Sequence, residues 1–530
     1  MLRHGEGVPI SLLFFSVAFL SWCRSRALHF YGSEHRGSVV DVALIHPPVD
    51  SVPLSASKGP ASEYPLMPMG LFSMAEYLER NGFEVRVVNL ALERLLNPHA
   101  GLRQLLAGLD AEVVGISLHW FVHSYGAVEV ARVVKSLLPN SKVVLGGFTA
   151  SYFAREIVER YSFVDAVVVG EGEEALLEIA SGAPLEKLKG VASRVGRRVS
   201  WNGYREPVED LDRYRYTNLK VLDRWSLYLR CSPSGFALTR RPSFWVAVAR
   251  SCPMNCAYCG GSREGYAAAM GRAKPAVRRP ERVAEDVEVL ASEYGVSVVK
   301  LSHDPLIWGE AYYSRLMEEI AKRGLDLRAY WDLTYLPREE QVRKALRAFE
   351  GGLCWGLSVE TVNDEVRARI GRPYTLGDIE RFLPVAENMG VILDGYFLVG
   401  LPGDTKEDVE KGIEYALKTM KRYKNVYFIP PFPYTMDPHA PMALRPKDYG
   451  VKVLCRSFEC YRRLVRSEKW ADWVVHETEQ LSKKEIAELT EKFYKTLAEA
   501  YRRGEFAENV ALRYSFEHEG ALVELPPGGG

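Results

Sequence analysis

Three cysteines near the middle of the chain have a spacing that suits cluster chemistry. Cys252, Cys256 and Cys259 form a C-x3-C-x2-C pattern, and Tyr258 directly precedes the third cysteine. Three thiolates on one short loop can bind three irons of a [4Fe–4S] cube and leave the fourth iron open to a small-molecule ligand. Residues 260–262, Gly-Gly-Ser, allow backbone N–H groups to face the sulfides. The alternatives are a zinc site or three unrelated core cysteines, but the sequence shows no second cysteine or histidine pair at a spacing that zinc favours.

This cysteine loop, with Tyr258 in place, resembles the signature of the radical S-adenosylmethionine (SAM) enzymes. The resemblance implies that a [4Fe–4S] cluster is bound by Cys252, Cys256 and Cys259, and that the amino and carboxylate groups of SAM bind its open iron. It also implies reductive cleavage of SAM to methionine and a 5′-deoxyadenosyl radical. An external electron donor such as flavodoxin or ferredoxin is then expected.

Composition limits the class of protein. The 530 residues suggest two large domains and a tail, and Lys+Arg and Asp+Glu number 68 each, so no overall field attracts nucleic acid or an anionic membrane. The remaining cysteines are scattered and do not resemble a secreted disulfide framework, which favours a reducing cytoplasm. These cysteines are Cys23, Cys231, Cys354, Cys455 and Cys460.

The first 37 residues form an N-terminal extension with an apolar run at residues 10–22. This run of 13 residues is shorter than the ~20 needed to span a bilayer. An upstream start codon, a membrane-surface anchor and a signal-peptide core are the alternatives.

Residues 38–190 alternate between short apolar runs and amphipathic stretches. The runs at 39–45, 84–89, 113–118, 142–145 and 166–169 are typical of buried strands, and the stretches between them predict helices. Strict alternation predicts a doubly wound parallel sheet. Ligands of such sheets bind at the carboxyl ends of the strands.

This domain resembles the cobalamin-binding domain that precedes the barrel in class B radical SAM enzymes. The match is carried by short motifs after successive strands, such as Pro47-Pro48 and Gly170-Glu171-Gly172-Glu173. Glycines there would let the backbone approach a flat macrocycle. The resemblance implies cobalamin contacts at Pro47, Gly70, Ser117, His119, Gly146, Gly147, Gly170 and Glu171.

One departure concerns cobalt ligation. The Asp-x-His-x-x-Gly element that supplies a cobalt-binding histidine in some cobalamin proteins is absent after the first strand, which argues against such ligation. For His119 the alternatives are a ligand and a structural hydrogen bond. Trp120 either lies under the lower corrin face or fills a pocket. For Glu171 and Glu173 the alternative to a cobalamin contact is a role as acids that cap the following helix.

A connector at residues 191–241, with a hairpin expected near 199–203, leads to a second series of strands at 242–430. The first strand, 244–249, leads directly into the cysteine loop, and five more follow at 297–302, 327–334, 353–359, 391–399 and 425–429. Six strand–helix units with functional residues at the strand ends predict a partial (β/α)6 barrel. Radical SAM enzymes share this fold.

Further SAM contacts are implied by the resemblance. They are Asp304, Ser358, Glu360, Gly395, Gly400 and Gly403. Simpler roles remain open: Glu360 as a helix cap, residues 400–403 as an ordinary strand-to-helix turn, and His303 facing the substrate instead. Arg250 is either an electrostatic partner of a cluster or carboxylate, or a solvated arginine of the barrel rim.

Residues 431–530 predict a Pro/aromatic loop near the barrel mouth, followed by helices. Cys455 and Cys460 lack companions for a second cluster, and a core or a lid over the substrate pocket is the expected role of the tail.

The combined features predict a cobalamin-dependent radical SAM enzyme that methylates an unactivated carbon of a small-molecule or lipid substrate. The alternative is the same architecture catalysing a non-methylating rearrangement, cyclisation or C–C coupling. A tRNA methylthiotransferase would need further cysteines in the first domain, and residues 38–190 contain none. No nucleic-acid partner is expected, and a cytoplasmic location, with association to a membrane surface left open, is predicted.

Overall fold

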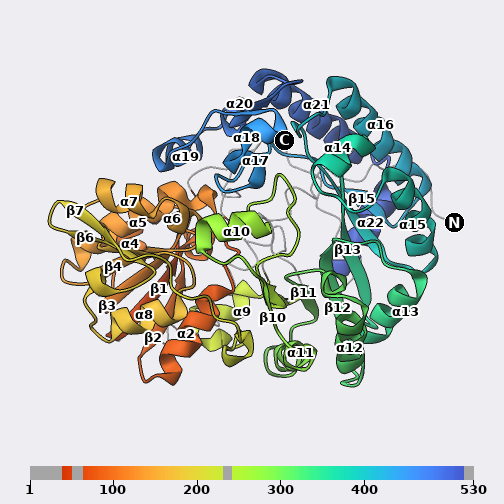
Figure 1. Cartoon of the computed structure of the whole chain (residues 1–530). Coiled ribbons are helices and arrows are strands. Elements are labelled where there is room, and N and C mark those ends of the chain that lie inside the picture. The colour runs from red at the N-terminus through yellow and green to blue at the C-terminus, as the bar shows by residue number, and fades with distance from the viewer. Residues whose placement is uncertain (1–38, 50–63, 231–240, 519–530) are drawn as a thin grey trace.

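The computed structural model describes residues 39–49, 64–230 and 241–518. Two α/β units lie side by side, and the C-terminal helices pass over both of them (Figure 1). The predicted N-terminal extension, with its apolar run, lies outside the described residues. No helix in the described ranges is long and apolar enough to cross a membrane.

The first unit is built on a seven-stranded sheet of order β2-β1-β3-β4-β5-β6-β7. Its strands are β1 Val40–His46, β2 Val85–Asn89, β3 Ala111–Ser117, β4 Lys142–Gly146, β5 Ala166–Val168, β6 Val191–Val195 and β7 Arg198–Trp201. The first five strands are parallel, as predicted, because amphipathic helices connect them. These helices are α2 Gly70–Arg80, α3 Leu90–Leu96, α4 Leu102–Leu105, α5 Ser124–Leu137, α6 Phe148–Tyr152, α7 Ala154–Arg160 and α8 Glu173–Ala180.

The hairpin that was expected in the connector is β6–β7, and it extends the first sheet in antiparallel fashion. The sheet therefore continues to Trp201, beyond the predicted boundary at residue 190. A signal for this was present in the sequence, since residues 191–195 and 198–201 flank the tight turn at Gly196. The rest of the connector holds the short helix α9 Trp225–Tyr228.

The second unit is a six-stranded parallel sheet of order β15-β14-β13-β12-β11-β8, which confirms the partial barrel. The strands are β8 Ser243–Val246, β11 Val298–Leu301, β12 Arg328–Leu333, β13 Gly352–Glu360, β14 Ile392–Phe397 and β15 Val426–Phe428. The helices are α10 Arg263–Met270, α11 Pro280–Tyr294, α12 Glu310–Ala321, α13 Glu339–Ala348, α14 Asp364–Arg369, α15 Leu376–Asn388 and α16 Lys406–Arg422. A small ladder of β9 Ala249–Arg250 and β10 Ala276–Val277 flanks the cysteine loop.

The C-terminal region holds short elements and two longer helices. They are α17 Pro441–Leu444, α18 Pro446–Tyr449, β16 Val451–Val453, α19 Phe458–Leu464, α20 Trp470–Trp473, β17 His476–Thr478, α21 Lys483–Arg502 and α22 Ala507–Glu517. Helix α22 packs against residues of the barrel strands. Its Arg513 forms an ion pair with buried Asp394 of β14 at 2.7 Å, and Phe516 packs in the same buried cluster as Tyr330 and Cys354.

The two units share a hydrophobic core. The cluster that covers one face of the first sheet continues through Ala257 of the cysteine loop to Met436 and Met442 of the C-terminal region. The relative position of the strand ends in the two units is therefore fixed by ordinary side-chain packing.

Cys455 and Cys460 form a disulfide in the structure. The sequence predicts no disulfide for this pair, because spacing alone does not reveal which thiols meet. Cys354 is free and buried in the barrel.

Candidate cofactor and active site

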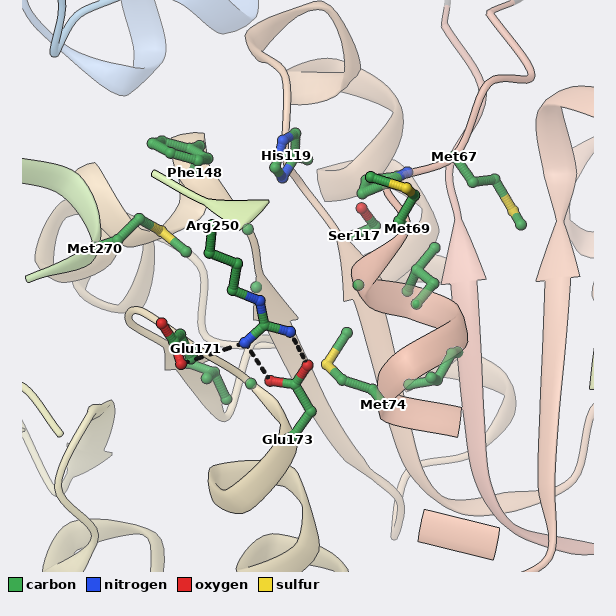
Figure 2. A pocket seen from close by; sticks show the side chains of 18 of the residues that line it. Met67, Met69, Met74, Ser117, His119, Phe148, Glu171, Glu173, Arg250 and Met270 are labelled. Atoms are coloured by element: carbon green, nitrogen blue, oxygen red, sulfur yellow. Dashed lines mark hydrogen bonds and ion pairs between the residues drawn. The ribbon is translucent and has the colours of Figure 1, made fainter. Parts of the chain in front are cut away.

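The carboxyl ends of the first sheet and of the barrel strands β8 and β11 face a cavity of about 470 Å³ (Figure 2). The first unit contributes the loops after β1, β3, β4 and β5, and the second contributes β8, β9 and β11. Among the predicted cobalamin contacts, the lining includes Gly70, Ser117, His119, Gly146, Gly147, Gly170 and Glu171. Pro47 follows β1 but does not line this cavity. Trp245, Ala247, Ser302 and His303 line it from the barrel.

Two glycines leave open space at the cavity wall. A Cβ built on Gly70 would meet nothing within 4 Å, and one on Gly146 would meet only Val168, at 3.9 Å. A side chain at either position would therefore occupy room that a bound molecule can use. A cavity wall without side chains at these two positions leaves room for a large flat group such as a corrin ring.

Gly147 has a different role. Its φ of +109° favours glycine, and a Cβ there would lie 2.8 Å from the backbone of His119. The loops after β3 and β4 can approach each other only because this side chain is missing.

His119 lies in the cavity between two aromatic rings. Its ring meets Trp120 edge-on at 4.8 Å and Phe148 at 5.2 Å. Burial lowers the pKa of His119 to about 4, so the imidazole is neutral at physiological pH. A neutral imidazole suits either of the two roles expected for it.

The carboxylates of Glu171 and Glu173 are held by arginines of the barrel. Glu171 pairs with Arg250 at 3.2 Å and with Arg272 at 2.6 Å. Glu173 accepts hydrogen bonds from Arg250 and from the Ser73 hydroxyl, the latter at 2.6 Å. Burial pushes the pKa of Glu173 upward, but Arg250 and Ser73 outweigh it and hold the pKa below its usual range. Arg250 is thus a partner of carboxylates, one of the two roles that its position suggested (Figure 2).

The three motif cysteines lie on the loop after β9, half-buried and without a disulfide. Ser251, directly before them, has a φ of +68°, so the chain enters the loop through a strained turn. In the described ranges no three His, Cys, Asp or Glu side chains converge on a single metal ion. In a cubane each of the three thiolates would bind a different iron.

Glu360 ends β13 with a φ of +65°, at a break in the pairing with β14. Its carboxylate accepts a hydrogen bond from the Tyr258 hydroxyl at 2.6 Å and pairs with Arg372 at 2.5 Å. Strained backbone of this kind is common at functional sites. Arg372 was missed by sequence reasoning, because its partners are more than ten residues away and no motif contains it.

Asp304 is buried at the end of β11. One carboxylate oxygen accepts the N–H of Leu306 at 3.0 Å, and the other accepts those of Thr334 and Tyr335 at 2.8 and 3.1 Å. Burial raises its pKa to about 6. The carboxylate thus anchors two loops of the barrel, and its contact with SAM stays a prediction.

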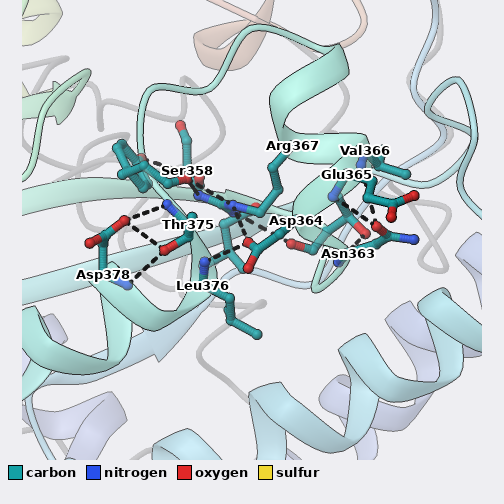
Figure 3. Close-up of polar contacts among 12 residues, drawn as sticks. Ser358, Asn363, Asp364, Glu365, Val366, Arg367, Thr375, Leu376 and Asp378 are labelled. Carbon is teal, nitrogen blue, oxygen red and sulfur yellow. Dashed lines mark hydrogen bonds and ion pairs between the residues drawn. The ribbon is translucent and has the colours of Figure 1, made fainter.

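Ser358 lies on β13 next to a loop that is fixed by helix caps (Figure 3). The Asn363 side chain accepts the backbone N–H groups at the start of α14, and Thr375 forms a capping box with Asp378 at the start of α15. The carboxylate of Asp364 joins the two caps by accepting the N–H of Leu376 at 2.7 Å.

The predicted glycine contacts are packed against protein. A Cβ on Gly395 would lie 2.3 Å from the Phe428 ring, and one on Gly400 would lie 2.9 Å from Ile486. The Gly400 carbonyl bonds to the His476 ring at 2.8 Å, and Gln480 accepts the Gly403 N–H at 3.2 Å. The C-terminal region therefore covers this turn, packing alone requires glycine at Gly395 and Gly400, and contact of these glycines with SAM stays a prediction.

Two family models match the chain. One, described as a B12 binding domain, matches residues 61–180, and the other, described as the radical SAM superfamily, matches residues 246–416. The chain is a radical SAM protein with a B12-binding domain. This confirms the predicted combination, and cobalamin, SAM and a [4Fe–4S] cluster are the cofactors that these domains bind.

Curated relatives of this radical SAM protein have different activities. An uncharacterized methyltransferase of Pyrococcus horikoshii is 24% identical over 405 residues, covering 75% of this chain and 82% of that protein. The anaerobic magnesium-protoporphyrin IX monomethyl ester cyclase of Cereibacter sphaeroides is 24% identical over 325 residues, covering 59% and 50%. The hopanoid C-3 methylase of Methylococcus capsulatus is 25% identical over 388 residues, covering 71% and 68%.

Solved structures share the fold of this radical SAM protein. The methyltransferase TsrM from Kitasatospora setae, with tryptophan and a SAM analogue bound, aligns with a TM-score of 0.59 at 19% identity, covering 80% of this chain and 82% of that one. OxsB, with aqua-cobalamin and SAM bound, aligns at 0.53 and 14% identity, covering 82% and 61%. At these identities the likeness establishes the fold.

Proposed function

We propose that this protein is a cobalamin-dependent methyltransferase that methylates an unactivated carbon of a small molecule. The observation that carries the proposal is the shared cavity, which is lined by the strand ends of the B12-binding domain and of the barrel. The cluster cysteines do not line this cavity, so a substrate would lie between a corrin bound in it and the cluster loop that follows β9. Proximity of this kind is the main contribution that a protein makes to such chemistry.

The bound cofactors supply radical formation from SAM and a transferable methyl group, and the chain's residues hold and separate them. Cys252, Cys256 and Cys259 would bind the cluster. The corrin would bind against the cavity wall at Gly70 and Gly146, where no side chain projects, and next to the remaining predicted contacts. Those contacts are Ser117, His119, Gly147, Gly170 and Glu171, and Pro47 is a proposed contact that lies outside the cavity lining.

Residues at the ends of the barrel strands would position SAM. We assign this role to Glu360, with its strained backbone and its links to Tyr258 and Arg372. The other proposed contacts are Asp304, Ser358, Gly395, Gly400 and Gly403.

The cavity wall favours an uncharged reacting group. Methionines line it from both units, at Met67, Met69, Met74 and Met270 (Figure 2). The charges of Arg250 and Arg272 compensate those of Glu171 and Glu173. A wall of this kind excludes water and suits an apolar part of a substrate.

The proposed domain limits are 38–190 for the B12-binding domain, 191–241 for the connector, 242–430 for the barrel and 431–530 for the C-terminal region. We further propose a cytoplasmic location and flavodoxin or ferredoxin as the electron donor, because a cluster that reduces SAM needs an external reductant. Association with a membrane surface would depend on residues 1–37.

Cyclisation is the second candidate. The similarity to the anaerobic magnesium-protoporphyrin ester cyclase supports it, although this chain spans only half the length of that protein. Product mass separates the two, because methylation adds one CH2 and cyclisation does not.

Anaerobic reconstitution with iron, sulfide and hydroxocobalamin tests the proposal. We expect about four irons and one corrin per chain, and formation of 5′-deoxyadenosine from SAM under reducing conditions. Cys256→Ala should lose SAM cleavage and keep the corrin. Methyl-deuterated SAM then reports methyl transfer to candidate acceptors. Iron without corrin would overturn the cobalamin-dependent reaction and favour the cyclisation candidate.

A further inference from the structure

Two tyrosine hydroxyls and one carboxyl group form a hydrogen-bond chain on the inner face of the barrel. The Tyr330 hydroxyl donates to Oδ1 of Asp332 at 2.8 Å, and it lies 2.6 Å from the Tyr396 hydroxyl. Because Tyr330 has only one hydroxyl proton to donate, Tyr396 is the donor in the second bond. The chain therefore runs from Tyr396 on β14 through Tyr330 to Asp332 on β12.

Gly356 of β13 makes room for this chain. It pairs in register with Asp332, and β13 lies between the two strands that carry the tyrosines. A Cβ on Gly356 would clash with Oδ1 of Asp332 and would lie 2.8 Å from the Tyr330 hydroxyl. The side chains can meet across β13 only because this glycine has none.

Asp332 faces the interior of the barrel and not the helices around it. Its neighbour Trp331 packs against Phe349 at the end of α13, and successive side chains of a strand point to opposite faces. Asp332 is exposed, whereas Trp331 and Leu333 are each 1% exposed. An exposed side chain on the inner face means that the barrel is hollow at this level.

The strand register places Asp332 beside the cavity described above. Trp245 and Tyr330 both pair with Lys300 of β11, one from each side, and their rings meet at 6.4 Å. Ser302, two residues after Lys300, lines the cavity, as Trp245 does. Asp332 lies two residues after Tyr330 and is therefore level with Ser302.

The position of Asp332 differs from those of the proposed SAM contacts. On β13 these are Ser358 and Glu360, two and four residues after Gly356. A strand rises about 3.3 Å per residue, so Asp332 lies about 7 Å short of the level of Ser358. No assigned contact of SAM or of the corrin lies on β12, and Asp332 is therefore available to a third molecule.

The second carboxyl oxygen of Asp332 determines what this residue can bind. Within the described ranges, Oδ2 makes no hydrogen bond and no ion pair. Desolvation inside the barrel raises the pKa of Asp332. An ionised Oδ2 accepts a hydrogen bond and a protonated one donates it. A hydroxyl group is both donor and acceptor, so it can bind to Asp332 in either protonation state.

We propose that Asp332 binds a hydroxyl group of the substrate and so orients the substrate along the methionine-lined wall. Apolar contacts are not directional, and a few polar groups fix the orientation of a ligand in such a pocket. The substrate class is therefore an alcohol with an apolar body. This inference rests on the proposed function, which supplies the reaction at the apolar carbon.

The test compares the binding of two probes, 1-hexanol and 1-fluorohexane, to the full-length protein reconstituted with cluster and hydroxocobalamin. Fluorine replaces the hydroxyl group in the second probe, donates no hydrogen bond and is a weak acceptor. Equilibrium dialysis with gas chromatography gives both dissociation constants. Asp332→Leu should weaken binding of 1-hexanol about fivefold and leave that of 1-fluorohexane unchanged, since it removes one hydrogen bond.

Asp332→Asn should keep the affinity for 1-hexanol within about twofold, because its amide donates to a hydroxyl group and its oxygen still accepts from Tyr330. A merely structural role of Asp332 would not separate the two probes in this way. Asp448→Asn is the matched control, because Asp448 is an exposed carboxylate that pairs with Arg445 at 2.8 Å. It should change neither affinity.

Equal affinity for 1-hexanol in the wild type and Asp332→Leu would overturn the proposal, and so would an equal loss for both probes. Loss of SAM affinity in Asp332→Leu, measured by calorimetry, would place Asp332 in the SAM site and would also overturn it. If this variant does not fold, Asp332→Ala removes the same oxygens without added bulk. Iron and corrin are measured separately, so a wild-type chain without them overturns the proposed function and not the preference for the alcohol.

Discussion

Arg250 of the barrel donates hydrogen bonds to Glu173 of the B12-binding domain, and it precedes Cys252 by only two residues. The side chains are 15% and 2% exposed, so the pair is shielded from water. Tyr214 of the connector lies against the same guanidinium, at 5.3 Å. The segment that enters the cluster loop is therefore tied to the domain that binds the corrin.

Arg250→Ala should be strongly destabilising, because it leaves Glu173 buried without its cation. The expected loss is about 3 kcal/mol in the free energy of unfolding, measured by urea denaturation. Removing both charges in Arg250→Met with Glu173→Gln should cost less than the single change.

The exposed pair of Arg343 and Glu339 is the control for Arg250, with side chains 63% and 58% exposed. Arg343→Ala should change the free energy of unfolding by less than about 0.5 kcal/mol. Equal losses in the buried and exposed variants would contradict the interpretation of Arg250 as a buried link.

Substitutions at two neighbouring glycines should separate folding from corrin binding. In Gly146→Ala the added methyl group contacts only Val168 of the protein, so the stability should stay near that of the wild type. The same methyl group occupies room that the corrin would use. We expect about tenfold weaker binding of hydroxocobalamin in a spectroscopic titration.

Gly147→Ala should instead lower the free energy of unfolding. The positive φ of this residue is unfavourable for alanine, and its Cβ would clash with the backbone of His119. Gly182→Ala is the control for the cost of a positive φ without a clash, since Gly182 has a φ of +84° and a Cβ there would meet no atom within 4 Å. It should cost about 1–2 kcal/mol, less than Gly147→Ala. Loss of corrin affinity in Gly147→Ala without loss of stability would contradict this assignment.

The contrast between these glycines illustrates what a sequence can and cannot predict. Short apolar runs and amphipathic stretches located both parallel sheets to within a few residues, and cysteine spacing located the cluster loop. The sequence could not distinguish Gly146, which faces the cavity, from Gly147, which faces a neighbouring loop. Contacts over long sequence separations, such as Arg250 with Glu173, depend on how the two units pack.

Two substitutions around Glu360 should have unequal effects. Glu360→Gln leaves Arg372 buried without a carboxylate and should cost about 3 kcal/mol in the free energy of unfolding. Tyr258→Phe removes the hydroxyl that donates to Glu360 and accepts from Arg372 but leaves the ion pair, so it should cost about 1 kcal/mol. Thermal unfolding of the two variants, with SAM binding measured by calorimetry, checks this order. Weaker SAM binding in Glu360→Gln alone would support its proposed role, and unchanged binding in both variants would contradict it.

The contribution of Asp404 to the free energy of unfolding should fall as pH rises. This carboxyl is buried and accepts one side-chain hydrogen bond, from the Thr361 hydroxyl at 2.8 Å, and burial raises its pKa from 3.8 to about 7. The folded state therefore holds the proton more tightly than the unfolded chain. Its stabilising effect is complete below pH 3.8 and is lost as pH rises toward 7.

Asp404→Asn removes this titration and keeps an oxygen that accepts the Thr361 hydroxyl. Relative to the wild type, the variant should gain about 3 kcal/mol in the free energy of unfolding between pH 5 and pH 8. Urea denaturation of both proteins at the two pH values measures the gain, and all other titrating groups cancel in the difference. An equal difference at pH 5 and pH 8 would mean that Asp404 ionises in the fold as it does in the unfolded chain, which its burial and single hydroxyl donor oppose.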